Sequence, residues 1–157
     1  MVPVLQSLVL AERIYEDKTG RKIIAGTFNR LKIRKQRKPV ETTNADGKKS
    51  VIVKGGVPGT PYAYISLTDV IDKTSIDLQF VSLSRNEVIF ETRIEITCND
   101  RLATVEIVAA LPRLPLHGPG IYAFELVCAG ELIGSHRIVA ELVDDNDDGE
   151  EERENEQ

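Results

Sequence analysis

The chain of 157 residues contains no tryptophan, one methionine, two cysteines and two histidines. Two cysteines are too few for the disulfide framework of a small secreted domain. No apolar run approaches the roughly 20 residues that a membrane-spanning helix requires, which argues against an integral membrane protein. The first residues also lack a basic segment ahead of an apolar one, the pattern of a secretory signal. These absences lead us to expect one soluble, cytoplasmic globular domain.

The side chains that most often carry catalysis are scarce and far apart in the sequence. His117 lies in a proline-rich loop with no neighbouring nucleophile, and His136 falls in phase with apolar residues of an expected strand. Cys98 and Cys128 are also in phase with apolar neighbours, so we expect buried, unreactive thiols. A zinc site would need all four residues to converge. We therefore predict no catalytic residue, no metal ligand and no cofactor; a hydrolase or metal enzyme is the least favoured interpretation.

Alternation of apolar and polar residues between turn signals predicts an all-β domain. The clearest alternation covers residues 87–98, where apolar residues share one face and charged residues the other. The expected strands are 4–15, 22–34, 62–67, 76–83, 87–98, 103–111, 120–128 and 131–143, with an additional hairpin formed by 40–43 and 50–53. Seven or eight strands at this spacing favour a two-sheet antiparallel β-sandwich over a small barrel.

Local signals refine this expectation at several points. Turn residues at 17–20 predict a hairpin between the first two strands, and Ala129 with Gly130 predicts a tight hairpin between the last two. The apolar alternation breaks at Val81, which indicates a β-bulge. Residues 68–72 are the one segment for which we expect a helical turn.

The net charge of −5 conceals an uneven distribution along the chain. Residues 144–157 hold nine acidic residues and one basic residue, a net charge of −8, and contain no apolar residue. We expect a disordered acidic tail that screens a basic surface, engages a basic partner or only aids solubility. We therefore divide the chain into a domain, 1–143, and a tail, 144–157.

Residues 18–54 hold twelve basic residues against two acidic ones, a net charge of +10. Their most concentrated part is the basic ribbon, residues 30–54, which begins in the second strand and continues into a hairpin expected to project at about 32–54. The candidate partner-binding residues are Arg30, Lys32, Arg34, Lys35, Arg37, Lys38, Lys48 and Lys49.

Three interpretations of the basic ribbon remain open. It can contact an acidic protein surface or a phosphate backbone, or it can simply prevent unwanted pairing between sheet edges. No aromatic residue occurs between Phe28 and Tyr62, so the ribbon offers no stacking platform for single-stranded nucleic acid. The negative net charge of the whole chain is also unlike that of a dedicated nucleic-acid binder.

Three stretches carry a resemblance to a known family. They are residues 8–15 with 19–20 and 23–29, residues 62–67, and residues 111–126 with 130–132, where a proline-rich entry leads into P-G-x-Y-x-F-E-L. The chain resembles a family of small bacterial proteins and domains of uncharacterised function over most of 1–143. The resemblance implies an immunoglobulin-like β-sandwich and no known catalytic residues. The chain departs from the family pattern in the basic excursion and the acidic tail.

The sequence thus predicts a non-catalytic binding or scaffold module. We expect it to engage a protein partner, such as the product of a neighbouring gene, through the basic ribbon at 30–54. The alternative is a nucleic-acid-associated protein that binds phosphate through the same residues. We expect no membrane partner, and the oligomeric state stays open.

Overall fold

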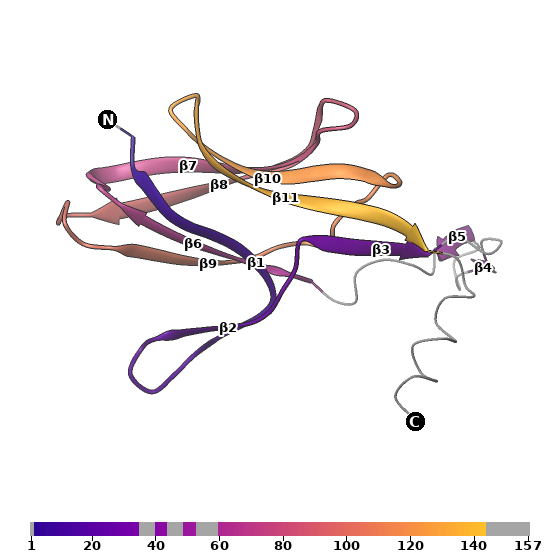
Figure 1. Ribbon diagram of the computed structural model, residues 1–157, viewed down its shortest axis with the longest axis horizontal. Helices are drawn as coiled ribbons and strands as arrows, with labels where there is room; N and C mark the ends of the chain where they lie inside the picture. The colour runs from indigo at the N-terminus through magenta and orange to yellow at the C-terminus, as the bar shows by residue number, and fades with distance from the viewer. Residues whose placement is uncertain (1, 35–39, 44–48, 53–59, 144–157) are drawn as a thin grey trace, which may run out of the picture.

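The computed structural model describes residues 2–34, 40–43, 49–52 and 60–143, and within these ranges every regular element is a β-strand (Figure 1). The strands are β1 (Val4–Glu16), β2 (Lys22–Thr27), β3 (Arg30–Arg34), β4 (Val40–Thr43), β5 (Lys49–Ile52), β6 (Tyr62–Thr68), β7 (Asp72–Ser82), β8 (Glu87–Cys98), β9 (Val105–Ala110), β10 (Gly120–Cys128) and β11 (Glu131–Val143). The prediction of an all-β protein is confirmed. No helix of the described residues is long and apolar enough to cross a membrane.

Two large sheets account for most of the strands. Sheet A has four strands in the order β2-β1-β6-β9, and sheet B has five in the order β3-β11-β10-β7-β8. Strands β4 and β5 pair with each other in a separate two-stranded sheet. The expected antiparallel pairing is confirmed for every pair except β3 with β11, which run parallel.

The hydrophobic core takes side chains from both large sheets. Its fully buried members include Leu10, Ile65 and Leu67 from sheet A, and Ile76, Leu78, Phe80, Phe124, Leu126 and Ile138 from sheet B. Phe80 is the centre of an aromatic group, with its ring centroid 4.8 Å from that of Phe124 and 5.5 Å from that of Tyr122. This layer of side chains joins the two sheets.

The sheets approach each other closely at Gly134 of β11. A Cβ atom on this residue would lie 2.1 Å from Cδ2 of Leu5 in β1, well inside van der Waals contact. Opposite Gly134, the pairing of β10 with β11 shifts register between Leu126 and Val127. The missing side chain of Gly134 therefore provides the space that Leu5 occupies.

Several local predictions are confirmed by the strand register. The hairpin between β1 and β2 is present, and the pairing of β7 with β8 shifts between Phe80 and Val81, where the bulge was expected. Ala129 and Gly130 form the last hairpin turn with φ values of 50° and 76°. Strand β8 has the predicted bounds, 87–98.

Two local predictions are wrong. Residues 22–34 form two strands in different sheets, because Gly26 adopts φ +72° and the chain crosses from sheet A to sheet B at 28–29. The helical turn expected at 68–72 is absent; Asp69 and Asp72 instead take left-handed φ values of 56° and 52°, which short acidic side chains tolerate.

The acidic tail, 144–157, and three parts of the basic ribbon, 35–39, 44–48 and 53–54, lie outside the described residues, as do residues 1 and 55–59. The predicted division into a domain and a tail therefore stays a prediction.

Candidate interaction surfaces

The first candidate surface is β3, the edge strand of sheet B that carries the described start of the basic ribbon. Arg30 and Lys32 are exposed, whereas Leu31 between them is 8% exposed and belongs to the core cluster. Ile33 packs against the same cluster. Side chains alternate across a strand. Packing of Leu31 and Ile33 against the core therefore leaves Arg30 and Lys32 on the solvent side.

The structure describes only part of the predicted site. Arg30 and Lys32 lie together on one face of β3, as the sequence predicts. Arg34 and Lys49 lie in β3 and β5, but their side chains are outside the described residues, as are Lys35, Arg37, Lys38 and Lys48 altogether.

Sequence reasoning missed the residues of β11 that flank this surface. Glu141 forms an ion pair with Arg30 and is the register partner of Lys32. Exposed Arg137 lies four residues before Glu141, on the same face of β11. The described part of the surface therefore has basic residues around one acidic residue, Glu141. The parallel pairing of β3 with β11 brings these residues together.

At the other edge of sheet B, several polar and charged side chains on its outer face contact one another. Nε of Arg93 donates to Oδ1 of Asp77 at 2.8 Å, and the second guanidinium nitrogen lies 3.2 Å from Oδ2. The hydrogen bond from Arg93 holds the pKa of Asp77 below its ordinary value. Gln79 donates to Glu91 at 2.6 Å on the same strands. These contacts between β7 and β8 satisfy the polar groups locally.

The second candidate surface is the outer face of sheet A. Tyr62 and Tyr64 of β6 are half-buried there, and Tyr64 lies between Val9 of β1 and Val108 of β9 in the strand register. The Tyr64 hydroxyl donates to Oε2 of Glu106 at 2.5 Å, which raises the pKa of Tyr64. The alternation of Tyr62 and Tyr64 is visible in the sequence. The sheet order that places a valine on each side of Tyr64 is not.

The third candidate surface is the arm, defined as residues 12–26 of the β1–β2 hairpin. β1 pairs with β6 only over residues 4–11, so the arm contains two strands and extends past the rest of sheet A (Figure 1). Tyr15 and Ile23, which are register partners, are 52% and 50% exposed. The arm therefore presents apolar side chains that the core does not cover.

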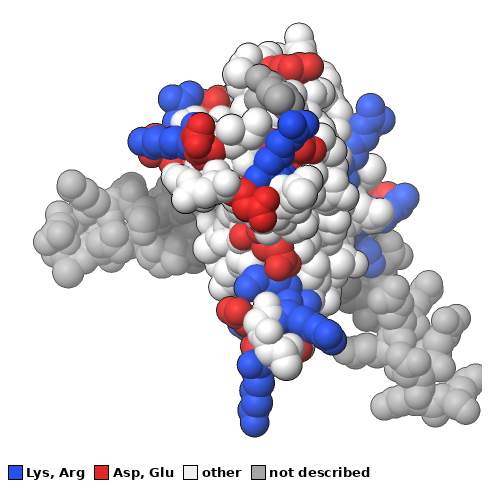
Figure 2. Space-filling view, turned by 90° about the vertical axis from the view of Figure 1, so that its left-hand side faces the viewer, with Lys and Arg blue, Asp and Glu red and all other residues white. Residues whose placement is uncertain are grey.

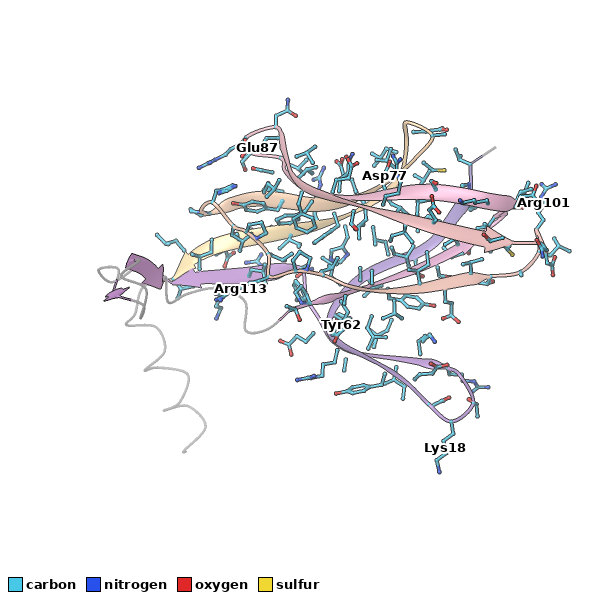
Figure 3. The ribbon with its side chains drawn as sticks, turned by 180° about the vertical axis from the view of Figure 1, so that it is seen from behind. Lys18, Tyr62, Asp77, Glu87, Arg101 and Arg113 are labelled. Carbon is cyan, nitrogen blue, oxygen red and sulfur yellow. The ribbon has the colours of Figure 1, made fainter. Side chains whose placement is uncertain are left out.

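The tip of the arm is an ordered turn around Asp17. Its Oδ1 accepts hydrogen bonds from the Thr19 hydroxyl at 2.7 Å, the Thr19 N–H at 2.8 Å and the Arg21 N–H at 2.9 Å. The hydrogen bond from the Thr19 side chain, followed by that from the Arg21 backbone, lowers the pKa of Asp17. Lys18 lies at the far end of this turn (Figure 3).

Figure 2 shows the end of the molecule where the turns of both sheets meet, and basic and acidic side chains are interspersed over it. One such pair joins the β6–β7 and β8–β9 turns, because Nε of Arg101 donates to Oδ1 of Asp69 at 2.9 Å. No group of three or more His, Cys, Asp or Glu side chains that could hold a metal ion occurs among the described residues.

The side chains of His136, Cys98 and Cys128 contact backbone carbonyl oxygens, whereas His117 makes its contact through its backbone. The backbone N–H of His117 donates to the Tyr122 hydroxyl at 3.2 Å, and Nε2 of His136 lies 3.1 Å from the Phe28 carbonyl oxygen. Both cysteines are free thiols, and burial raises the pKa of Cys128. A raised pKa reduces the thiolate fraction, which is the reactive form.

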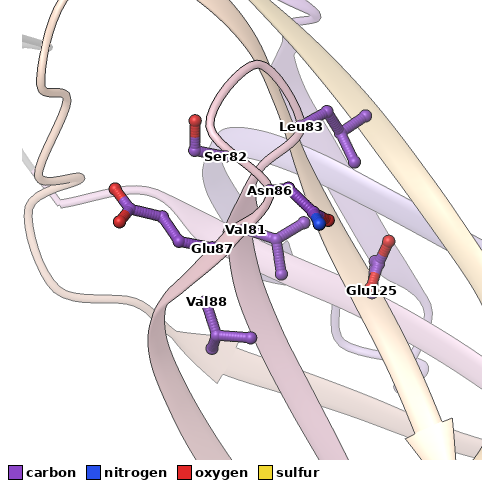
Figure 4. A pocket seen from close by; sticks show the side chains of 7 residues that line it. All are labelled: Val81, Ser82, Leu83, Asn86, Glu87, Val88 and Glu125. Atoms are coloured by element: carbon purple, nitrogen blue, oxygen red, sulfur yellow. The ribbon is translucent and has the colours of Figure 1, made fainter.

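A shallow depression of about 150 Å³ lies at the β7–β8 turn (Figure 4). Its lining residues are Val81, Ser82, Leu83, Asn86, Glu87, Val88 and Glu125. Ser82 is 2% exposed, and its hydroxyl accepts the Arg85 N–H at 3.2 Å. The volume lies below the roughly 300–1,000 Å³ typical of small-molecule sites. The depression is therefore a weaker candidate than the three surfaces.

Comparison of the whole chain with models of protein families and with curated proteins gave no match.

Proposed function

We propose that the protein is a non-catalytic binding module that engages an acidic surface of a protein partner through β3. The observation that carries the proposal is the alternation along this edge strand. Arg30 and Lys32 are exposed while Leu31 and Ile33 pack against the core. A charged pair held on a packed strand loses little further conformational entropy when a partner binds.

Glu141 favours a protein partner over a phosphate backbone. Its ion pair with Arg30 places a negative charge next to the residues that phosphate would have to approach. A protein surface with charges of both signs can complement this arrangement, whereas a polyanion is repelled by its acidic member.

We also propose that the two sheets form an immunoglobulin-like β-sandwich. The Tyr122 hydroxyl, at the start of β10, donates to the Gly118 carbonyl at 2.7 Å and accepts the His117 N–H. A tyrosine that hydrogen-bonds the backbone a few residues upstream is a recurrent feature of such sandwiches. The parallel pairing of β3 with β11 brings an early strand beside the last one.

Affinity capture with three forms of the protein tests the β3 assignment. The double variant Arg30→Glu with Lys32→Glu should lose a partner that the unchanged protein retains. The control, Lys18→Glu with Arg85→Glu, changes the net charge equally at exposed positions in two turns. It should retain the partner. If all three forms capture the same proteins, the assignment to β3 is wrong.

An electrophoretic mobility shift with duplex DNA and with RNA tests the alternative. Phosphate binding through β3 should weaken steeply between low and moderate salt and should be reduced by Arg30→Glu with Lys32→Glu. Salt-sensitive binding that the Lys18→Glu, Arg85→Glu control leaves intact would favour a nucleic-acid-associated protein over the proposed module.

A further inference from the structure

β2 is an open edge of sheet A. It is the terminal strand in the order β2-β1-β6-β9, and no other described strand pairs with its outer side (Figure 1). In the arm, this edge belongs to a hairpin of only two strands. A two-stranded hairpin is marginally stable in water, and further strands increase its stability.

The hydrogen bond at the base of the turn establishes which backbone groups face this edge. The Asp17 N–H donates to the Arg21 carbonyl at 2.9 Å, so Asp17 and Arg21 form a hydrogen-bonded pair. In an antiparallel ladder such pairs alternate with non-hydrogen-bonded pairs. With the observed register, Ile23 turns its backbone groups toward β1, whereas Lys22 and Ile24 turn theirs toward the open edge.

The side chains along this edge offer little protection against pairing. Lys22 is the only charged residue of β2, and Ile24 occupies the centre of its exposed backbone groups. By contrast, the β8 edge carries Glu87, Glu91, Arg93 and Glu95. Natural sheets block their edges with charges of this kind.

A second copy adds a further charge contact along this edge. Gly26 has no side chain, and the carboxylate of Glu12 lies across it, with Oε2 3.1 Å from the position of a Gly26 Cβ. Lys22 lies on the same face, two positions from Ile24 in the other direction, and its Nζ lies 3.4 Å from Oε1 of Glu16 in the same copy. An antiparallel β2 centred on Ile24 places Lys22 of one copy opposite Gly26 of the other, beside the carboxylate of Glu12.

We propose that β2 pairs with β2 of a second copy of this chain, antiparallel and about a two-fold axis through Ile24. In this register the backbone groups of Ile24 pair with those of Ile24 in the other copy. Ile14 and Ile24 of both copies form one continuous apolar row. On the opposite face Ile23 lies against Ala25 of the other copy. Both sheets A then join into one sheet of eight strands.

Sedimentation equilibrium of the full chain measures this dimer. Ile24→Lys places two like charges at the two-fold axis. It should raise the dimer dissociation constant at least about tenfold, because the symmetry removes the apolar cross-strand contacts of Ile24 from both copies. The control Leu102→Lys adds the same charge at a residue that is 88% exposed in the β8–β9 turn and should leave the constant unchanged. A dimer unaffected by Ile24→Lys would overturn the proposal.

A charge exchange tests the pairing of Lys22 with Glu12. Lys22→Glu should weaken the dimer, and Lys22→Glu combined with Glu12→Lys should restore most of the lost affinity. Equal weakening by the single and double variants would contradict this register. An unchanged protein that stays monomeric up to about 1 mM would overturn the dimer itself.

Cysteine cross-linking reports the register directly. Hydrogen-bonded partners in an antiparallel pair have Cα atoms about 5.5 Å apart, which suits a disulfide. Ile24→Cys should therefore give a covalent dimer on mild oxidation, whereas Ile23→Cys and the unchanged protein, with its native Cys98 and Cys128, should not. Equal cross-linking of the Ile24 and Ile23 variants would exclude a two-fold axis through Ile24.

Discussion

The arm and the core differ in how much of each residue is covered. Phe80 and Phe124 have no exposed surface and contact aromatic neighbours from other strands, whereas Tyr15 and Ile23 of the arm are about half exposed. Burial of apolar surface is the main source of folding free energy. Stability therefore resides between the two sheets. The arm contributes little to it, and its side chains are available to a partner.

The largest effect is expected from Phe80→Ala in the core. Loss of a fully buried phenyl ring and the cavity that it leaves should reduce the free energy of unfolding by about 3–5 kcal/mol. Urea denaturation followed by circular dichroism measures this change. A loss below about 1 kcal/mol would show that the core tolerates the cavity far better than its packing suggests.

A smaller core effect is expected from Gly134→Ala. The added methyl group meets Leu5 Cδ2, and the resulting displacement should cost about 1–3 kcal/mol of unfolding free energy. In a Leu5→Ala background the same substitution should cost clearly less, because the obstructing atoms are gone. Equal costs in both backgrounds would mean that another contact determines the requirement for glycine.

In the arm, Tyr15→Ser should change the free energy of unfolding by no more than about 0.5–1 kcal/mol. Backbone hydrogen exchange should also be faster at Ile23, whose N–H faces β1, than at Ile65, since the arm can open without exposing the core. Hydrogen exchange measured by NMR at low protein concentration separates the two regions. Equal protection at both residues would show that arm and core unfold together.

The smallest effect concerns the turn of the arm at acidic pH. The lowered pKa of Asp17 means that its ionised carboxylate stabilises the turn at pH values above the ordinary value of 3.8, and that this stabilisation is lost as the pH falls through the folded pKa. The amide resonances of Thr19 and Arg21 should shift together over that interval. Asp17→Asn keeps an acceptor oxygen but does not titrate, so the shared transition should disappear.

Local alternation in the sequence predicts the strands well where one face is buried. Residues 87–98 match β8, and the interrupted alternation at Val81 marks a real bulge, because both features depend on neighbouring residues only. The division of 22–34 was missed because Gly26 fits a strand pattern and also permits the left-handed φ that it adopts just before β2 ends at Thr27.

The candidate surfaces are less accessible to sequence reasoning because they depend on sheet order. The basic residues of β3 are evident in the sequence, yet the acidic Glu141 beside Arg30 comes from a strand more than a hundred positions away. The open edge of β2 likewise follows from the absence of a further described strand beside it. No local pattern encodes either arrangement.

The parallel register of β3 and β11 has a consequence for the charged segments beyond it. Arg34 and Val143 are partners at the end of this pairing, so the most basic segment and the acidic tail are attached to the domain at adjacent points. We propose that this shared point of attachment gives residues 144–157 a high effective concentration at the basic segment. On this proposal, an acidic ligand of that segment competes with residues 144–157, whose net charge is −8. Affinity for such ligands depends on the position of attachment as well as on the contacts made.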